Sequence, residues 1–152
     1  MIKEILMIIG LSMTPIGELR AGIPYGLINT NIHWTQVFLI AILANILIGF
    51  IVYFFMDKFV QQFLKYQWFN KLYAKCVESP RQKVQKITQK YGEYGLILFI
   101  GIPLPGTGAY SGAIGAHLLG LNYKKFIIAN CLGVVLAGII VTTLVMTGKL
   151  LL

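Results

Sequence analysis

The segment GIPLPGTGAYSG at 101–112 decides how this chain can fold, because it opens the backbone inside an apolar stretch. From Tyr94 to Tyr123 the sequence contains no Asp, Glu, Lys or Arg. The centre of that stretch nevertheless holds two prolines and several glycines, which are the residues least compatible with a continuous helix. In hydrocarbon, an opened backbone is tolerated only where protein buries it or where it lines a wet cavity. The sequence therefore favours a chain that turns back within 94–121.

The composition of the whole chain indicates an integral membrane protein. Of its 152 residues, 57% are hydrophobic and 12% are charged, whereas a soluble domain is about half apolar and about a quarter charged. The sequence carries no low-complexity linker that would separate two domains. A single membrane domain over 1–152 is therefore expected.

The net charge of +8 is concentrated in one polar segment. Eight of the thirteen Lys and Arg residues lie between Lys58 and Lys90. Basic loops beside membrane spans tend to stay cytoplasmic, so 57–93 is predicted to be a cytoplasmic connector that faces anionic membrane lipids. Within it, 58–79 is expected to form an amphipathic surface helix. Nucleic-acid binding, the other explanation of a basic run, is not expected in so hydrophobic a chain.

Four apolar stretches organise the chain: 5–29, 35–56, 94–121 and 126–148. The second and fourth have the length and composition of membrane spans. Proline and glycine interrupt the first and third, and we expect each of these to fold as a re-entrant helical hairpin. The alternative is that both interrupted stretches span fully, which would give a plain four-helix protein. Under the hairpin interpretation, one hairpin and one span form a unit that occurs twice, at 1–56 and 94–152.

The two units also resemble each other in sequence. Pro15 and Pro105 are ninety residues apart, and ILIGFIV at 46–52 aligns with VLAGIIV at 135–141 at an offset of eighty-nine. Broken segments at corresponding places in two halves are typical of transporters, where they meet at the binding site. The predicted fold is therefore an all-α inverted repeat of hairpin plus span, with a cytoplasmic amphipathic helix as connector.

The first interrupted stretch contains TPIGELRAGIPYG at 14–26, where Glu18 and Arg20 are the only charges between residues 5 and 56. An intramembrane charge costs about 2.5–3.5 kcal/mol on insertion scales, so each needs a partner or a task. At i and i+2 the two side chains do not face each other on a helix. Two interpretations stay open. Glu18 either favours its own helix start after Thr14 or carries a proton, and Arg20 either snorkels to the interface or binds a substrate.

Two half-helices that begin near the prolines would direct their free N–H groups at the membrane interior from opposite sides. Helix N-termini attract anions, and the arginine would add a forked donor suited to phosphate or carboxylate. For the glycines, close helix packing is the alternative to ligand contact. The candidate substrate-binding residues are Glu18, Arg20, Pro15, Gly17, Pro103, Pro105, Gly106, Thr107, Gly108 and Tyr110.

The remaining polar residues give weaker signals. Asn45 and Asn130 lie within the predicted spans, where an amide typically bonds to a neighbouring helix. The sequence contains no Ser-His-Asp set, H-E-x-x-H motif, Walker loop or cysteine cluster. We therefore expect no enzymatic activity, no metal site and no cofactor.

Two motifs carry a resemblance to a known family: PIGELRAGIPYG at 15–26 and PLPGTGAYSGAIGAHLLGL at 103–121. Both resemble the bacterial small multi-drug export proteins, distant relatives of the DedA/VTT-type membrane proteins. The resemblance implies paired re-entrant hairpins in a multi-pass protein of the bacterial cytoplasmic membrane. It also implies either efflux of small compounds or, from the wider superfamily, movement of phosphate-bearing lipids, often with proton coupling. Glu18 and Arg20 match the acidic and arginine pattern of that superfamily, whereas GTGAYSG at 106–112 departs from it by carrying no charge.

The expected function is that of a secondary transporter or flippase for an amphipathic, anionic substrate. Glu18 would carry a coupling proton, Arg20 would hold the anionic group, and the backbone of 103–108 would supply further donors. One alternative is an exporter of hydrophobic cations, which would depend on Glu18 but not on Arg20. Another is a non-transporting membrane scaffold that acts through its basic segment. The expected partners are membrane lipids, a small amphipathic substrate and a second copy of the chain in a homodimer.

Overall fold

The computed structural model describes residues 1–60, 82, 84–88, 94–104 and 106–151, and this part of the chain is helical, without a β-strand. The all-α class that the sequence predicts is therefore confirmed. Most of the predicted surface helix at 58–79 and most of the connector at 57–93 lie outside the described residues. The elements are α1 (Ile2–Ser12), α2 (Leu19–Asn29), α3 (Trp34–Phe55), the π-helical turn η1 (Met56–Val60), α6 (Tyr94–Gly101), α7 (Ala109–Leu118) and α8 (Tyr123–Leu151).

Two long helices form the frame of the molecule. The stretches Trp34–Lys58 and Tyr123–Gly148, of 25 and 26 residues, are long and apolar enough to cross a membrane. They pack against each other through Asn130, whose Nδ2 donates to the carbonyl oxygen of Ile46 at 3.1 Å. Gly49 allows this approach, since a Cβ there would lie 2.6 Å from Asn130 Nδ2. The prediction that Asn130 bonds to a neighbouring helix is confirmed.

The outer face of α3 is apolar along its length. Large exposed side chains recur every four residues, at Leu39, Leu43, Leu47 and Ile51. A four-residue spacing places them on one face of the helix. A continuous exposed apolar face is rare on soluble monomers and is expected where protein meets lipid or another chain. The face therefore fits a helix that crosses a bilayer.

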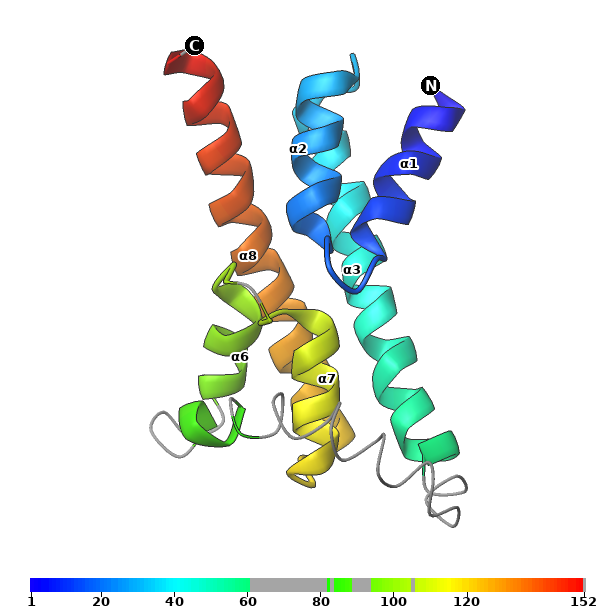
Figure 1. The fold of residues 1–152 in the computed structure, drawn as a ribbon, viewed down its shortest axis with the longest axis vertical. Coiled ribbons are helices and arrows are strands. Elements are labelled where there is room, and N and C mark those ends of the chain that lie inside the picture. Colours follow the sequence, from blue (N-terminus) through cyan, green and yellow to red (C-terminus); the bar gives the residue numbers. More distant parts are fainter. Residues whose placement is uncertain (61–81, 83, 89–93, 105, 152) are drawn as a thin grey trace.

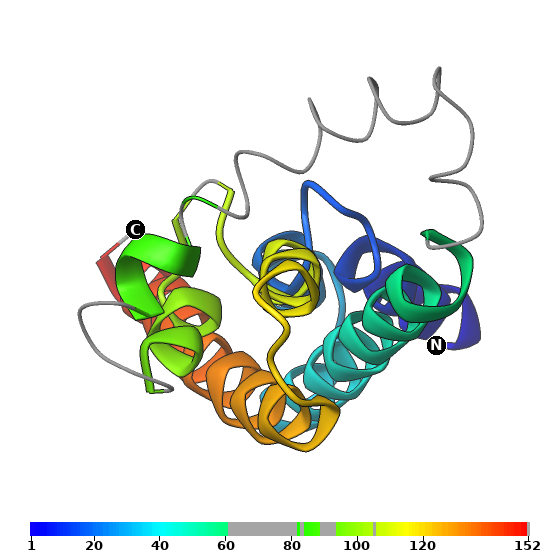
Figure 2. The ribbon, with the colours of Figure 1, turned by 90° about the horizontal axis from the view of Figure 1, so that it is seen from below.

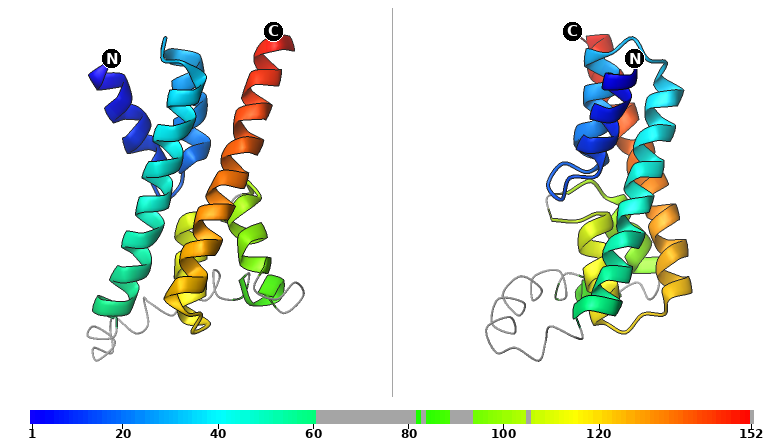
Figure 3. Two further views of the ribbon diagram at one scale, coloured as in Figure 1. Left: turned by 180° about the vertical axis from the view of Figure 1, so that it is seen from behind. Right: turned by 90° about the vertical axis from the view of Figure 1, so that its right-hand side faces the viewer.

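The four shorter helices form two hairpins that come from opposite ends of the molecule. In Figure 1, α1 and α2 run antiparallel and turn at 13–18, at the end of the hairpin away from the chain termini. Helices α6 and α7 run antiparallel, and the turn between them, of which 102–104 and 106–108 are described, points in the opposite direction. The turns of the two hairpins meet about half-way along the molecule (Figure 3). The chain therefore turns back where proline and glycine interrupt the apolar stretches.

The second helix of each hairpin packs against both long helices. Viewed along the long axis, α7 lies in the angle between α3 and α8, with α2 behind it (Figure 2). Both α2 and α7 contact α3 and α8. Helix α2 begins at Leu19 and α7 at Ala109, ninety residues later, and each begins four residues after a proline. The long helices begin at Trp34 and Tyr123, eighty-nine residues apart. The helix starts therefore repeat at the same offsets, ninety and eighty-nine residues, as the sequence motifs.

Candidate functional site

The candidate site lies where the two turns meet and the N-termini of α2 and α7 face each other. Five of the predicted residues come together here: Glu18, Arg20, Thr107, Gly108 and Tyr110. We call these five residues the tip contact. Each hydrogen bond in it joins residues more than eighty positions apart in the sequence, so it connects the two halves of the chain.

Glu18 lies at the centre of the tip contact and is 5% exposed. It precedes the first residue of α2 with φ of 50°, a conformation that is uncommon for residues other than glycine. Its side chain does not cap α2. Instead, Oε1 accepts a hydrogen bond from the backbone N–H of Tyr110 at 3.2 Å. The carboxylate thus lies at the N-terminus of the opposite helix, α7, where the helix dipole favours a negative charge.

Gly108 provides the space that the Glu18 carboxylate occupies. A Cβ at position 108 would overlap the carboxylate oxygens. Gly108 also has φ of 121°, which side chains rarely adopt. Both the space and the backbone conformation therefore require glycine at this position. Gly108 is ninety residues after Glu18, so the two occupy equivalent places before α2 and α7.

Arg20 reaches from the first turn of α2 to the turn of the second hairpin. Its Nη1 donates to the carbonyl oxygen of Leu104. Its Nη2 lies 2.9 Å from both the carbonyl oxygen and the hydroxyl oxygen of Thr107. Backbone carbonyl groups in an irregular turn need hydrogen-bond partners, and Arg20 supplies a donor to those of Leu104 and Thr107. Its guanidinium group therefore holds the second hairpin to the first.

Thr107 organises the turn that Arg20 binds. Its hydroxyl lies 2.7 Å from the carbonyl oxygens of Ile102 and Leu104, and its single hydrogen can donate to one of them at a time. The same oxygen accepts from the backbone N–H of Leu104 at 3.2 Å. The side chain of Thr107 thus closes the turn on itself. The carbonyl oxygens of Leu104 and Thr107 accept hydrogen bonds from Arg20.

Tyr110 joins the first turn of α7 to the end of α1. Its backbone N–H binds Glu18, and its hydroxyl donates to the carbonyl oxygen of Met13 at 2.5 Å. Met13 is the C-cap residue that follows α1, at a helix end where backbone carbonyls lack helical partners. Asn45 of α3 serves the same helix end, since its Nδ2 donates to the carbonyl oxygen of Ser12 at 3.0 Å. The predicted role of Asn45 in binding a neighbouring helix is confirmed.

The other candidate residues lie in the turns. Pro15 is exposed in the first turn, where the N–H of Gly17 donates to Thr14 Oγ1 at 3.2 Å. Pro103 is half-buried in the second turn, and Gly106 is exposed there with φ of 78°. Pro105 lies outside the described residues. The carbonyl groups of Leu104 and Met13 also belong to the site, and the sequence did not predict them. They are backbone acceptors, which every residue type carries.

The tip contact combines one carboxylate and one guanidinium, each bonded to the opposite hairpin. Both charged groups come from the first hairpin, and separation of the hairpins would remove their hydrogen-bond partners in the second. In the described part of the chain, no three His, Cys, Asp or Glu residues are placed to hold a metal ion.

Comparison with known proteins places the chain in a family. Residues 18–140 match the family described as "Putative small multi-drug export protein". The chain belongs to this family. The match begins at Glu18 and includes every residue of the tip contact, and with the two long apolar helices it indicates that this export-family member is a membrane protein. No curated protein and no solved structure matches the chain.

Proposed function

We propose that this member of the small multi-drug export family is a secondary transporter that exports small hydrophobic cations, with the tip contact as its moving part. The observation that carries the proposal is the burial of the Glu18 carboxylate between two hairpins from opposite ends of the molecule. Glu18 is the only Asp or Glu in the four apolar stretches. An intramembrane carboxylate of this kind is by default a functional group.

We further infer that the hairpins are re-entrant and that the two halves form an inverted repeat. The hairpin helices have 11, 11, 8 and 10 residues. At about 1.5 Å per residue, none can cross a hydrocarbon core of about 30 Å. If α3 and α8 cross the bilayer, the tip contact lies near its midplane, where transporters built from inverted repeats bind their substrates. The protein is then a multi-pass protein of the bacterial cytoplasmic membrane.

A cation is favoured as substrate because the anion-binding groups of the tip contact already form hydrogen bonds within the protein. Three Arg20 hydrogen bonds go to Leu104 and Thr107, and the Tyr110 N–H goes to Glu18. A proton or a cationic substrate that binds the Glu18 carboxylate would weaken its attraction to the N-terminus of α7. Proton and cation would then compete for one group, so that proton entry could drive cation release. A ligand shifts such an equilibrium by its different affinity for the two states.

An anionic amphipathic substrate, including a phosphate-bearing lipid, is the second candidate. It is supported by Arg20 and the Tyr110 N–H, which bind carbonyl and carboxylate oxygens in the tip contact. Phosphate oxygens are recognised by the same donor types. Transport of this kind would require Arg20 as its anion-binding group. Neither candidate assigns a chemical reaction to the chain. Both are proposed for a homodimer, because the two spans of one chain enclose little space.

Everted membrane vesicles, with a fluorescent hydrophobic cation added outside, test the proposal. With a pH gradient that is acid inside, vesicles that contain the native chain should accumulate the cation. Glu18→Gln should lower the rate of cation uptake at least about tenfold. Asp57→Asn is the matched control, since Asp57 is exposed in η1, which follows α3, and lies outside the tip contact. Size-exclusion and helical circular dichroism of each purified variant show that it is folded.

Two outcomes would overturn the cation proposal. One is native cation transport in Glu18→Gln. The other is a folded native protein that moves phosphate-bearing amphipaths but not cations, with loss of that transport in Arg20→Gln, which would select the second candidate. If the native protein moves neither class of compound, the scaffold interpretation would gain support instead.

A further inference from the structure

An open pocket of about 620 Å³ lies at the end of the molecule that carries both chain termini, well away from the tip contact. Three parts of the chain line it: the start of α1, the loop between α2 and α3, and the start of α3. Its volume is within the range of about 300–1,000 Å³ that is usual for small-molecule sites. We call it the Glu4 pocket.

The lining of the Glu4 pocket combines an apolar wall with one carboxylate. Ile5, Ile32 and Ile40 supply aliphatic surface, and Glu4 supplies the charge. Gln36 adds an exposed amide. An apolar cavity with a few polar groups that fix orientation is the usual construction of a ligand site. With a carboxylate as its charged group, the pocket selects a cation that has an apolar body.

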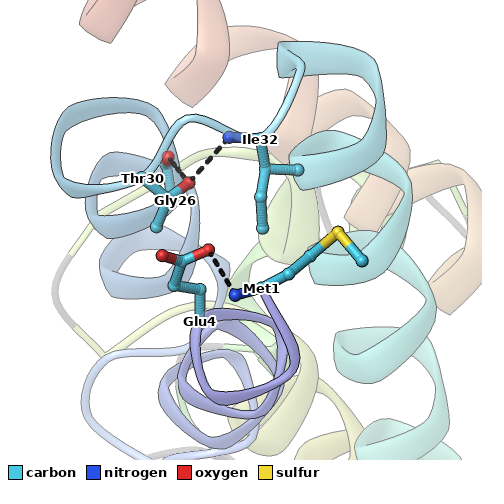
Figure 4. A network of polar contacts seen from close by, with 5 residues as sticks. All are labelled: Met1, Glu4, Gly26, Thr30 and Ile32. Carbon is cyan, nitrogen blue, oxygen red and sulfur yellow. Dashed lines mark hydrogen bonds and ion pairs between the residues drawn. The ribbon is translucent and has the colours of Figure 1, made fainter.

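An ammonium group already lies beside this carboxylate. The α-ammonium of Met1 is 3.3 Å from Glu4 Oε2 (Figure 4). The Met1 side chain is 84% exposed and that of Glu4 is 41% exposed. An exposed ion pair contributes about 0–1 kcal/mol, so a ligand can exchange with Met1 at small cost. The pair shows that an ammonium fits at the edge of the pocket.

The wall opposite α1 is held in place by Thr30 (Figure 4). Its hydroxyl donates to the carbonyl oxygen of Gly26 at 2.6 Å and accepts from the N–H of Ile32 at 3.3 Å. These bonds tie the loop after α2 to the last turn of that helix. Ile32 is therefore fixed before any ligand arrives, which lowers the ordering cost of binding.

The same construction recurs in the second half of the chain. A pocket of about 340 Å³ lies at the opposite end of the molecule, lined by the start of α6, the end of the α7–α8 loop and the start of α8. Four lining residues of the two pockets are eighty-nine positions apart: Ile32 with Leu121, Gln36 with Lys125, Leu39 with Ile128 and Ile40 with Ala129. Because both halves build a pocket from equivalent positions, the Glu4 pocket is a feature of the fold. The charged group differs, since the first pocket has Glu4 and the second has Lys125.

We propose that the Glu4 pocket is a binding site for small hydrophobic cations. The cationic group lies beside Glu4, and the apolar body packs against Ile5, Ile32 and Ile40. This site is separate from the tip contact, and the proposal stands on binding alone, whatever the protein transports.

Equilibrium dialysis of the purified protein in neutral detergent tests the site, with tetraphenylphosphonium as the probe. Tetraphenylborate is the matched control ligand, because it has the same shape and the opposite charge. We expect Glu4→Gln to weaken tetraphenylphosphonium binding about fivefold, the size of one half-exposed ion pair. Gln36→Lys copies the residue of the second pocket, so it should weaken tetraphenylphosphonium binding and strengthen tetraphenylborate binding.

Asp57→Asn, at an exposed carboxylate outside both sites, should keep the native affinity for tetraphenylphosphonium. The Glu4→Gln comparison is repeated in the Glu18→Gln background, in which the tip contact lacks its carboxylate, so that the loss is assigned to the Glu4 pocket. Glu4 and Gln36 have solvent-accessible side chains, so their variants are expected to fold. Unchanged tetraphenylphosphonium affinity on Glu4→Gln substitution, in either background, would overturn the proposal. A loss of about fivefold from Glu4→Gln in both backgrounds would support the pocket, whether or not Glu18→Gln abolishes transport.

Discussion

The two halves of the chain have the same order of elements but bring different chemistry to the place where they meet. The first half contributes side chains, Glu18 and Arg20. At the equivalent positions the second half has Gly108 and Tyr110, and it contributes mainly backbone: the N–H of Tyr110 and carbonyl groups in its turn. The comparison teaches why GTGAYSG carries no charge. A carboxylate at position 108 would occupy the space of the one that Glu18 already places there.

Among the variants that test this comparison, substitutions of Gly108, such as Gly108→Ala, should lower the stability of the protein most. The added Cβ overlaps the Glu18 carboxylate and also forces a side chain onto φ of 121°. We expect the free energy of unfolding to fall by about 3 kcal/mol, measured by thermal unfolding in mild detergent. Gly120→Ala separates the two causes, because Gly120 has φ of 66° but no neighbour within 4 Å of the added atom. It should cost about 1 kcal/mol. Equal losses in the two variants would show that the carboxylate does not need this space.

Moving the carboxylate tests whether the halves are equivalent. Gly108→Glu alone should destabilise the protein by about as much as Gly108→Ala or more, since two carboxylates then compete for one site. Combined with Glu18→Gly, it should recover more than half of that loss, because the carboxylate at position 108 can then reach the N-terminus of α2. A double variant that is no more stable than Gly108→Glu would show that positions 18 and 108 are not equivalent. A double-mutant cycle on thermal stability measures the coupling.

Arg20→Gln should cause the next largest loss of stability. It removes the forked donor from Leu104 and Thr107 and leaves the charge of Glu18 without its nearby cation. We expect a loss of about 2–3 kcal/mol in the free energy of unfolding. Arg20→Lys keeps the charge but not the fork, so it should lose less stability than Arg20→Gln. If the two variants are equally unstable, the fork rather than the charge holds the turn.

Tyr110→Phe should have the smallest effect. The variant loses the hydrogen bond to the carbonyl oxygen of Met13 but keeps the backbone N–H that binds Glu18. The expected loss of unfolding free energy is about 1 kcal/mol, with cation transport retained. A loss of transport as large as that of Glu18→Gln in a folded Tyr110→Phe protein would mean that the hydroxyl, and not only the backbone, belongs to the site.

The elements of the fold that could be predicted are those with a local signal. The apolar runs at 35–56 and 126–148 correspond to α3 and α8, because length and hydropathy alone define a span. The places where the chain turns follow from proline and glycine, since neither fits a helix interior. Each second hairpin helix starts four residues after the proline, at Leu19 and Ala109, because the intervening residues form the turn.

The partners within the site could not be predicted. Glu18 and Arg20 were recognisable as groups that needed partners, because charges in an apolar stretch are costly. However, the partner of Glu18 is a backbone N–H ninety-two residues away, and those of Arg20 include the carbonyl groups of Leu104 and Thr107. A backbone group has the same chemistry in every non-proline residue, so it leaves no pattern in the sequence.

The exposed side chains of the two turns give the protein a built-in pair of labelling positions. Ile16 is 95% exposed on the first turn, and Leu104 is 57% exposed on the second, although its carbonyl group is bound to Arg20. Cysteines at these two positions, in a chain without its native Cys76 and Cys131, could carry spin labels that leave the hydrogen bonds intact. The distance between the labels would then report whether the two turns separate, as the proposed transport requires.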